Sequence, residues 1–231
     1  MTTIEKITQV QQRIKQACEN AHRDPEDVTL LAISKKKPTS MIREAWNNGL
    51  HHFGENYIQE WRAKNEELED LKMEGLHWHI TGPLQKNKCK YVAGKVALIH
   101  TISSLSLLEE IAKRTPKEII QPVLIQCNLS KEATKSGFQE IEQIEQLLTS
   151  HHHWKNIDIQ GFMVLPPFSE NPEDSRSHFH QLQMLREKLR STTGLPLPHL
   201  SMGMSADLEI AIEEGATIVR VGTAIFGQRV S

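Results

Sequence analysis

The sequence predicts an α/β fold, a single (β/α)8 TIM barrel with an extra helix at its N-terminus. Extended apolar segments alternate with segments of helical periodicity along all 231 residues. No Pro-, Gly- or Ser-rich linker and no change of composition divides the chain, so we expect residues 1–231 to form one domain. A doubly wound open sheet, which has the same alternation of elements, stays the structural alternative.

The N-terminal segment has apolar residues at spacings of three and four from Ile4 to Ala21, which predicts an amphipathic helix. Thr2 and Glu5 are placed to form its capping box. The next segment, residues 28–34, is almost continuously apolar, as is typical of strands buried on both faces of a parallel sheet.

The remaining elements follow in regular alternation. We expect strands at residues 28–34, 51–56, 76–81, 97–102, 121–129, 157–165, 197–203 and 216–222. We expect the intervening helices at residues 40–48, 57–71, within 84–96, and at 104–114, 139–148, 172–191 and 206–214.

Composition excludes several classes of protein. The net charge of −2 lacks the basic excess of a nucleic-acid binder. The sequence contains no run of 18 apolar residues that could span a membrane, and its N-terminus lacks the apolar core of a secretion signal. We therefore expect a cytoplasmic protein. Cys18, Cys89 and Cys127 lie far apart without a CxxC pair, which indicates reduced thiols.

Chemistry in such barrels collects where the strands end, and the first strand ends in three lysines within "LLAISKKKPTS". Because strand side chains alternate, Lys35 shares a face with Leu31 and Ile33 and would rise from the barrel mouth. Lys36 would point outward, and Lys37 would lie farther out in the loop. The plain alternative is a solvated basic loop, but a partly desolvated lysine amine can attack a carbonyl.

The last strand, "TIVRVG", places Arg220 on the same face as Ile218 and Gly222. Val219 and Val221 suit the outer, helix-facing side, so Arg220 would point into the barrel. A buried guanidinium needs an acceptor, which is either a carboxylate in an internal salt bridge or a ligand.

Two loops have the composition of a phosphate site, which barrels often form after strands seven and eight. Gly222 permits close approach of the backbone, and Thr223 and Ser205 offer hydroxyl groups. The alternatives are a plain N-cap for Ser205 and a simple turn for Gly222. A lysine, a phosphate cradle and an arginine around one mouth are what bound pyridoxal phosphate (PLP) requires.

At this point the sequence resembles a known family. The segments "LLAISKKKP", "HFGENYIQE", "LHWHITGPLQKNK", "ATKSG", "SMGMSADLEIAI" and "VRVGTAIFG" are similar, in this order, to those of the YggS/PROSC family of PLP homeostasis proteins. The resemblance implies a barrel of the alanine racemase N-terminal type with PLP on Lys35 as a Schiff base. It also implies a set of cofactor-binding residues, which comprises Lys35, Asn56, Ser201, Ser205, Arg220, Gly222 and Thr223.

We interpret the chain as a PLP carrier and buffer and not as an enzyme. An arginine at the pyridine nitrogen makes PLP a weak electron sink. Racemisation needs an acid or base on each face, and neither Tyr57 nor Tyr91 lies in a segment that resembles the tyrosine motif of the racemases' second domain. The alternatives are a PLP-dependent racemase and a barrel with a phosphate ligand but no aldehyde chemistry. We expect a monomer that meets apoenzymes transiently, with no metal.

Secondary candidates have simpler explanations. Lys135 is either a second aldehyde acceptor near the mouth or an ordinary surface lysine. The histidines of "HHHW", residues 151–154, are expected to connect a helix to a strand and not to bind metal. Either His77 or His79 approaches the mouth or both are structural. The sequon at Asn128 has no role in a cytoplasmic protein.

Overall fold

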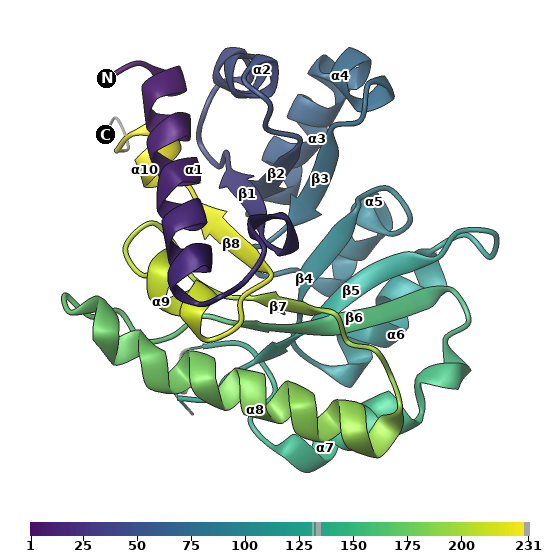
Figure 1. Cartoon of the computed structure of the whole chain (residues 1–231). Helices are drawn as coiled ribbons and strands as arrows, with labels where there is room; N and C mark the ends of the chain where they lie inside the picture. The colour runs from purple at the N-terminus through teal and green to yellow at the C-terminus, as the bar shows by residue number, and fades with distance from the viewer. Residues whose placement is uncertain (131, 133–134, 229–231) are drawn as a thin grey trace.

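The computed structural model describes residues 1–130, 132 and 135–228, and its centre is a closed barrel of eight parallel strands (Figure 1). Neighbouring strands follow the order of the chain, and the last pairs with the first, Arg220 lying beside Leu31. The predicted barrel is confirmed, and the open sheet is excluded by this closing pair. The strands are β1 Thr29–Ile33, β2 His52–Glu55, β3 His77–Ile80, β4 Leu98–Ile102, β5 Gln121–Cys127, β6 Ile157–Val164, β7 His199–Ser201 and β8 Ile218–Val221.

Helices surround the barrel and connect its strands. They are α1 Thr3–Asn20, α2 Thr39–Asn47, α3 Ile58–Glu67, α4 Glu69–Met73, α5 Cys89–Val92, α6 Leu105–Arg114, α7 Ile141–Thr149, α8 Arg176–Thr193, α9 Leu208–Glu213 and α10 Thr223–Phe226. The single helix predicted for 57–71 is wrong. The chain breaks it at the fully buried Leu68, whose φ of −110° leaves the helical region. Within 84–96 only one 3-10 turn and the single turn of α5 form.

The extra helix α1 begins with the predicted capping box. The Thr2 hydroxyl accepts the Glu5 amide at 3.2 Å, and the Glu5 carboxylate accepts the Thr2 amide at 2.8 Å. The helix packs along α9 and α10 (Figure 1). Its Arg13 donates to both carboxylate oxygens of Glu209 and to the carbonyl of Ser205 at 3.0 Å. The N-terminal helix therefore supports the loop that follows β7.

Side chains alternate between the inside of the barrel and the layer under the helices, as the strand parity predicts. One small apolar cluster lies inside the barrel and contains Leu31, Leu98, Leu124, Met163 and Ile218. Val219 and Val221 belong instead to the large outer core between the strands and the helices. The orientation expected for β1 and β8 is thus confirmed, and it directs Arg220 inward.

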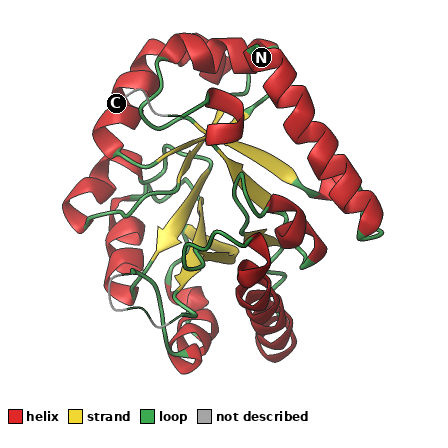
Figure 2. Cartoon of the chain, turned by 90° about the vertical axis from the view of Figure 1, so that its left-hand side faces the viewer, coloured by secondary structure: helices red, strands yellow, loops and turns green. Residues whose placement is uncertain are grey.

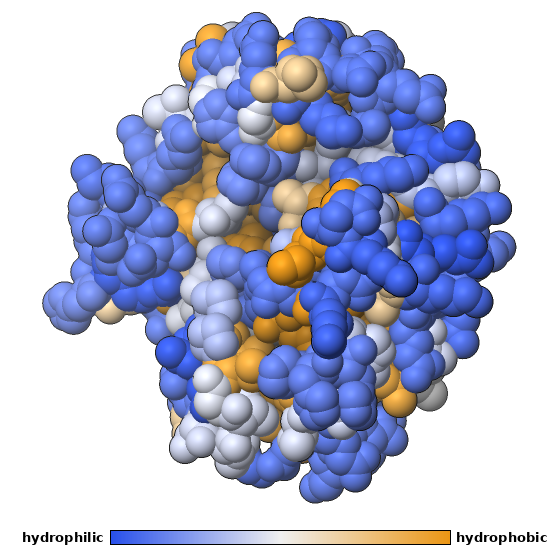
Figure 3. Space-filling model, turned by 90° about the vertical axis from the view of Figure 1, so that its right-hand side faces the viewer, coloured by the Kyte–Doolittle hydropathy of each residue, from blue (hydrophilic) through white to orange (hydrophobic). Residues whose placement is uncertain are grey.

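The two ends of the barrel differ in what they present. Figure 2 looks onto the end to which the strands point, where the loops after the strands gather. Figure 3 looks onto the opposite end, where a mostly hydrophilic rim surrounds apolar residues in a hollow. Among the helices of the described residues, none combines the length and the hydropathy that a membrane span requires.

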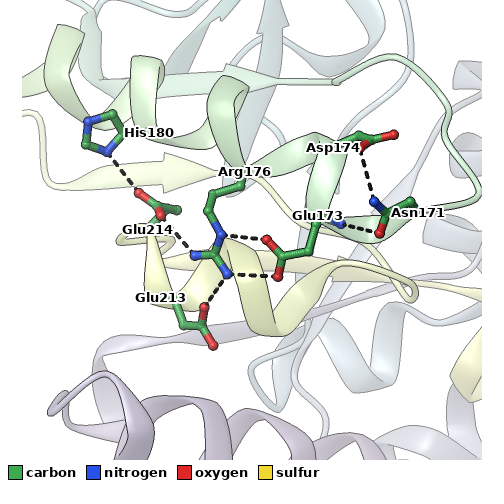
Figure 4. A network of polar contacts seen from close by, with 7 residues as sticks. All are labelled: Asn171, Glu173, Asp174, Arg176, His180, Glu213 and Glu214. Carbon is green, nitrogen blue, oxygen red and sulfur yellow. Dashed lines mark hydrogen bonds and ion pairs between the residues drawn. The ribbon is translucent and has the colours of Figure 1, made fainter.

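A network of charges on the outside joins the start of α8 to the end of α9 (Figure 4). Arg176 donates to Glu173 at 2.7 and 3.0 Å, to Glu213 at 2.7 Å and to Glu214 at 3.0 Å. His180 adds a contact of 3.0 Å to the second oxygen of Glu214. These carboxylates raise the pKa of the Arg176 guanidinium. The network fixes α9 against α8 on the side of the barrel that carries the loop after β7.

Candidate functional site at the ends of the strands

The ends of the strands enclose a cavity of about 400 Å³. Six of the seven residues predicted to bind the cofactor line it, namely Lys35, Asn56, Ser205, Arg220, Gly222 and Thr223. The seventh, Ser201, is fully buried directly behind Arg220. The structure therefore gathers these residues from four strand ends, those of β1, β2, β7 and β8, into one place, as expected for a barrel site.

Lys35 follows β1 at the start of a tight turn, in which the Lys37 amide donates to the Ser34 carbonyl at 3.0 Å. Lys36 occupies the left-handed region with a φ of 58° and is exposed. Because a side chain is strained in that region, the turn depends on support from its surroundings. The turn separates Lys35 from Lys36 as predicted, with the half-buried Lys35 at the cavity and Lys36 in solvent.

A buried charge cluster supplies that support from beneath the turn. The Lys64 ammonium donates to the Ser34 carbonyl at 2.8 Å and to carboxylate oxygens of Glu55 and Glu60 at 2.7 Å each. Glu55 also accepts the Ser34 hydroxyl at 2.6 Å, and Glu60 accepts the Lys36 amide. The peptide groups on both sides of Lys35 are thus held by Lys64 and Glu60 of α3, and Glu55 of β2 holds the Ser34 side chain.

Burial raises the pKa of the Glu55 carboxyl, and the ammonium of Lys64 opposes this shift. Sequence reasoning missed this cluster. One signal was present, because Lys64 continues the buried helical stripe of Ile58 and Trp61 at spacings of three. A lysine on an apolar stripe needs a buried partner, and Glu55 at the end of β2 is that partner.

Lys37 departs from the prediction of a residue farther out in the loop. Its side chain turns back, lines the cavity and donates to the carbonyls of Phe226, Gly227 and Gln228 at 2.9, 3.2 and 3.1 Å. Those carbonyls lie at the end of α10, where they lack helical donors and attract a cation. Lys37 thereby joins the loop after β1 to the segment after β8.

The loops after β7 and β8 form the wall that was predicted to hold phosphate. Ser205 is not the N-cap of α9, because that position belongs to Asp207. The Ser205 hydroxyl instead accepts the amide of Ala224 in the first turn of α10, at 3.4 Å. Gly222 lies against β1, and a Cβ there would meet the Ile33 carbonyl oxygen at 3.3 Å. Glycine therefore permits this close approach.

Asp207 is the one acidic residue among the described residues that line the cavity. Its carboxylate is occupied on both oxygens, by the Ser175 hydroxyl at 2.9 Å and by the Met204 amide at 2.7 Å. Since the same cavity carries Lys35, Lys37 and Arg220, its charge favours an anionic ligand. Sequence reasoning did not identify Asp207, because its role depends on a loop contact between distant segments.

Arg220 is 5% exposed and makes two hydrogen bonds. Its Nη1 donates to Ser201 Oγ at 2.8 Å, and its Nη2 donates to the Val164 carbonyl at 2.9 Å. Within the described part of the chain, no carboxylate oxygen lies within ion-pair distance. Burial lowers the pKa of Arg220 to about 10, against the attraction of Asp207. Of the two predicted explanations for a buried guanidinium, the internal salt bridge is therefore wrong.

Asn56 lines the opposite wall, where the Thr81 hydroxyl donates to its Oδ1 at 3.0 Å. Its backbone is packed against Gly82, where a Cβ would come within 2.2 Å of the Asn56 carbonyl oxygen. Thr81 itself lines the cavity. The ends of β2 and β3 thus hold the Asn56 amide in one position.

The secondary candidates fall mostly outside the cavity. Lys135 pairs with Glu132 at 3.0 Å beside a smaller hollow of about 200 Å³, while Ala133 and Thr134 of its motif lie outside the described residues. The Asn128 amide donates to two loop carbonyls at 2.9 Å, which is a structural role. His79 is buried inside the barrel, and His77 is exposed at the start of β3, so neither lies at the mouth.

The histidines at 151–153 and a second hollow both lie apart from the predicted site. Residues 151–153 form a 3-10 turn between α7 and β6, as expected, and no group of three metal-ligating side chains occurs in the described part of the chain. A larger hollow of about 750 Å³ lies between α6 and α7. Its lining includes residues of the loops after β4 and β5, such as Ser103 and Gly137, but none of the residues predicted to bind the cofactor, so its size does not make it the site.

Comparison with known proteins places this geometry in context. The family described as "Alanine racemase, N-terminal domain" matches residues 7–230. The chain is 47% identical over 230 residues to a "Pyridoxal phosphate homeostasis protein" of Aquifex aeolicus, covering 99% of both chains. It is 39% identical over 229 residues to a protein of the same description from Escherichia coli K12, covering 96% of this chain and 95% of that one.

Solved structures agree with the fold. The PLP-bound structure of PipY from Synechococcus elongatus is 31% identical and superimposes with a TM-score of 0.84, covering 98% of this chain and all of that one. Alanine racemase from Corynebacterium glutamicum is 15% identical with a TM-score of 0.69, and the match covers 98% of this chain but 62% of the racemase. The second likeness concerns the fold alone.

Proposed function

Because the chain belongs to the family of PLP homeostasis proteins, built on the alanine racemase N-terminal fold, we propose that it binds PLP in the cavity and holds it as a Schiff base on Lys35. The observation that carries this proposal is the single cavity that unites Lys35, Arg220 and the loops after β7 and β8. A relative of the same fold, 31% identical, has been solved with PLP bound.

The residues of the cavity fit such a group. A phosphate needs several donors and no competing carboxylate, and this wall offers the Ser205 and Thr223 hydroxyls beside the first turn of α10. Asp207 does not compete, because both of its oxygens are already bonded. Arg220 keeps N–H groups without a partner among the described residues, and these suit an acceptor such as a ring nitrogen.

The residues of this chain favour holding the cofactor over catalysis. PLP supplies an aldehyde that reacts reversibly with an amine, and its ring stabilises a carbanion well only when its nitrogen is protonated. The fixed charge of Arg220 opposes that protonation. Besides Lys35 and Arg220, the charged side chains among the described lining residues are Lys37 and Asp207. Lys37 is bonded to carbonyls, and Asp207 is bonded to the Ser175 hydroxyl and the Met204 amide. We therefore propose a carrier and buffer of PLP, acting as a monomer in the cytoplasm and passing PLP transiently to apoenzymes.

The direct test compares the visible absorption of the purified protein, loaded with PLP, with that of Lys35→Ala. The wild type should show the absorption band of a Schiff base, and Lys35→Ala should not. Lys36→Gln is the matched control, because Lys36 is adjacent in sequence but exposed. Borohydride reduction followed by peptide mass mapping should place the adduct on the peptide that contains Lys35. An adduct on another lysine would refute the site, and none at all would favour a phosphate ligand without aldehyde chemistry.

The competing hypothesis is a PLP-dependent racemase. It predicts that the loaded protein interconverts the enantiomers of a small amino acid and that Lys35→Ala abolishes this activity. Incubation with single enantiomers followed by chiral chromatography measures the conversion. Sustained turnover dependent on Lys35 would overturn the carrier assignment.

A further inference from the structure

A column of hydrogen bonds crosses the inside of the barrel and ends on Arg220. His52 Nδ1 lies 3.0 Å from His79 Nε2, and His79 Nδ1 lies 2.9 Å from His100 Nε2. His100 Nδ1 in turn lies 2.9 Å from Ser201 Oγ, which accepts Arg220 Nη1 at 2.8 Å. The column links β2, β3, β4, β7 and β8 from the far end of the barrel to the cavity.

The column is buried and uncharged over most of its length. His79 is 4% exposed, and His100 and Ser201 are fully buried. Burial lowers the pKa of both histidines well below its usual range. The half-buried His52 has its pKa lowered to about 4 by burial and by the neighbouring His77 and His51. The other charged or titratable groups that face the column are Arg220 and His199.

Because each ring is neutral, all the hydrogen bonds of the column must run in the same direction. A neutral imidazole has one N–H donor and one acceptor nitrogen, so each tautomer determines the next along the column. Two directions are possible, one with every N–H pointing toward Arg220 and one with every N–H pointing away. A cation favours the negative ends of neighbouring dipoles, so the second direction is favoured.

In that arrangement the Ser201 hydroxyl donates to His100 Nδ1 and its oxygen stays an acceptor for Arg220. His100 donates through Nε2 to His79, and His79 donates through Nε2 to His52. Each contact then has one donor and one acceptor. The Nε2–H of His52 is left for water at the half-buried end of the column.

We propose that His52, His79, His100 and Ser201 form a positioning relay, which fixes the Ser201 oxygen as an acceptor and thereby holds Arg220 oriented and charged at the cavity without a carboxylate. A carboxylate would cancel the charge of the guanidinium. Neutral dipoles stabilise the charge but leave it available to a ligand. The inference rests on the proposed function only in naming PLP as that ligand.

The relay is tested first in the protein without added PLP. Long-range ¹H–¹⁵N spectra of protein with labelled histidines distinguish the two neutral tautomers from the imidazolium. The relay requires His79 and His100 to be neutral Nε2–H tautomers across the pH range from neutral to mildly acidic. An Nδ1–H tautomer or a charged ring at His100 would overturn it, whatever the protein binds.

The second test separates the two sides of His100. The side-chain amide of Asn comes near the position of Nδ1, and that of Gln comes near the position of Nε2. His100→Gln should lose the bond to Ser201 and weaken PLP binding by up to about tenfold, as expected for the loss of one buried hydrogen bond. It should also shift the visible absorption of the bound cofactor. His100→Asn should keep an acceptor for Ser201 and retain an affinity close to that of the wild type.

His199→Gln is the matched control, because this half-buried histidine of β7 contacts Thr217 and lies outside the column. Thermal unfolding verifies that each variant is folded. Equal effects of His100→Asn and His100→Gln on PLP binding would indicate simple packing and refute the relay. A wild-type protein that binds no PLP would refute the proposed function instead, and the tautomer measurement would still decide the relay.

Discussion

Two arginines, Arg176 on the outside of the barrel and Arg220 on the inside, have very different surroundings. Arg176 is 37% exposed and donates to three carboxylates in the network between α8 and α9 (Figure 4). Arg220 is 5% exposed and donates to a hydroxyl and a carbonyl, with no carboxylate at ion-pair distance among the described residues. The partly exposed arginine is paired with carboxylates, and the buried arginine is not.

The difference indicates which arginine serves stability and which serves binding. Exposed ion pairs contribute little to the free energy of unfolding, since water already solvates both partners. A buried charge without a counter-charge is costly, and such costs concentrate at functional sites. The number of ion pairs would rank Arg176 as the important residue, but burial and missing partners identify Arg220.

The largest effect is expected at Lys64, which is buried like Arg220 but paired with carboxylates like Arg176. Its substitution therefore tests what pairing contributes when the charge is buried. Lys64→Met leaves the fully buried Glu55 carboxylate without its cation, so we expect a loss of about 3–5 kcal/mol in the free energy of unfolding. Urea unfolding at neutral pH measures the change. The loss should shrink as the pH falls below neutral, since the raised pKa of Glu55 lets it take up a proton.

The double variant Glu55→Gln with Lys64→Met is the control for this prediction, because it removes both charges. It should recover part of the lost stability. An equal loss in the single and double variants would indicate that shape, and not the uncompensated carboxylate, determines the effect.

The second prediction concerns Arg220→Met, which keeps the bulk of the side chain and removes its charge. We expect PLP affinity to fall at least about tenfold, because a bond to a charged group is lost. We expect the free energy of unfolding to stay unchanged or to rise, because the cost of burying an unpaired charge disappears. Cofactor titration and urea unfolding of the same protein measure both. A large loss of stability with intact binding would reverse the roles assigned to the two arginines.

The smallest effect is expected for Arg176→Ala. Removing the exposed network should lower the free energy of unfolding by about 1 kcal/mol or less and the melting temperature by about 2–4 °C, and it should leave PLP affinity unchanged. Differential scanning calorimetry at low and high salt provides the measurement, since screening should reduce the difference. A change in PLP affinity would mean that the α8–α9 network controls the loop after β7.

Much of the site was accessible from the sequence because strand side chains alternate. Strand parity alone directed both Lys35 and Arg220 to the inner face of the barrel. A glycine with nearby hydroxyl residues indicated the loops that were predicted to hold phosphate. The sequence left open whether His77 or His79 reaches the mouth, because the height of each in the barrel depends on the register of β3 with β2 and β4. Lys37 was misplaced because the free carbonyls that attract it belong to residues at the other end of the chain.

The sequence by itself determined the alternation of strands and helices, the capped N-terminal helix and the residue types at each strand end, since these depend on local spacing and on side-chain chemistry. The tertiary structure alone decided which of them meet. Closing β8 onto β1 sets Arg220 beside Leu31 and brings Gly222 against Ile33, next to Lys35. The register of β2, β3 and β4 aligns His52, His79 and His100 in one column, and closure of the barrel brings that column against Ser201 and Arg220 of β7 and β8, because the stagger of a closed barrel fixes the height of every residue in it.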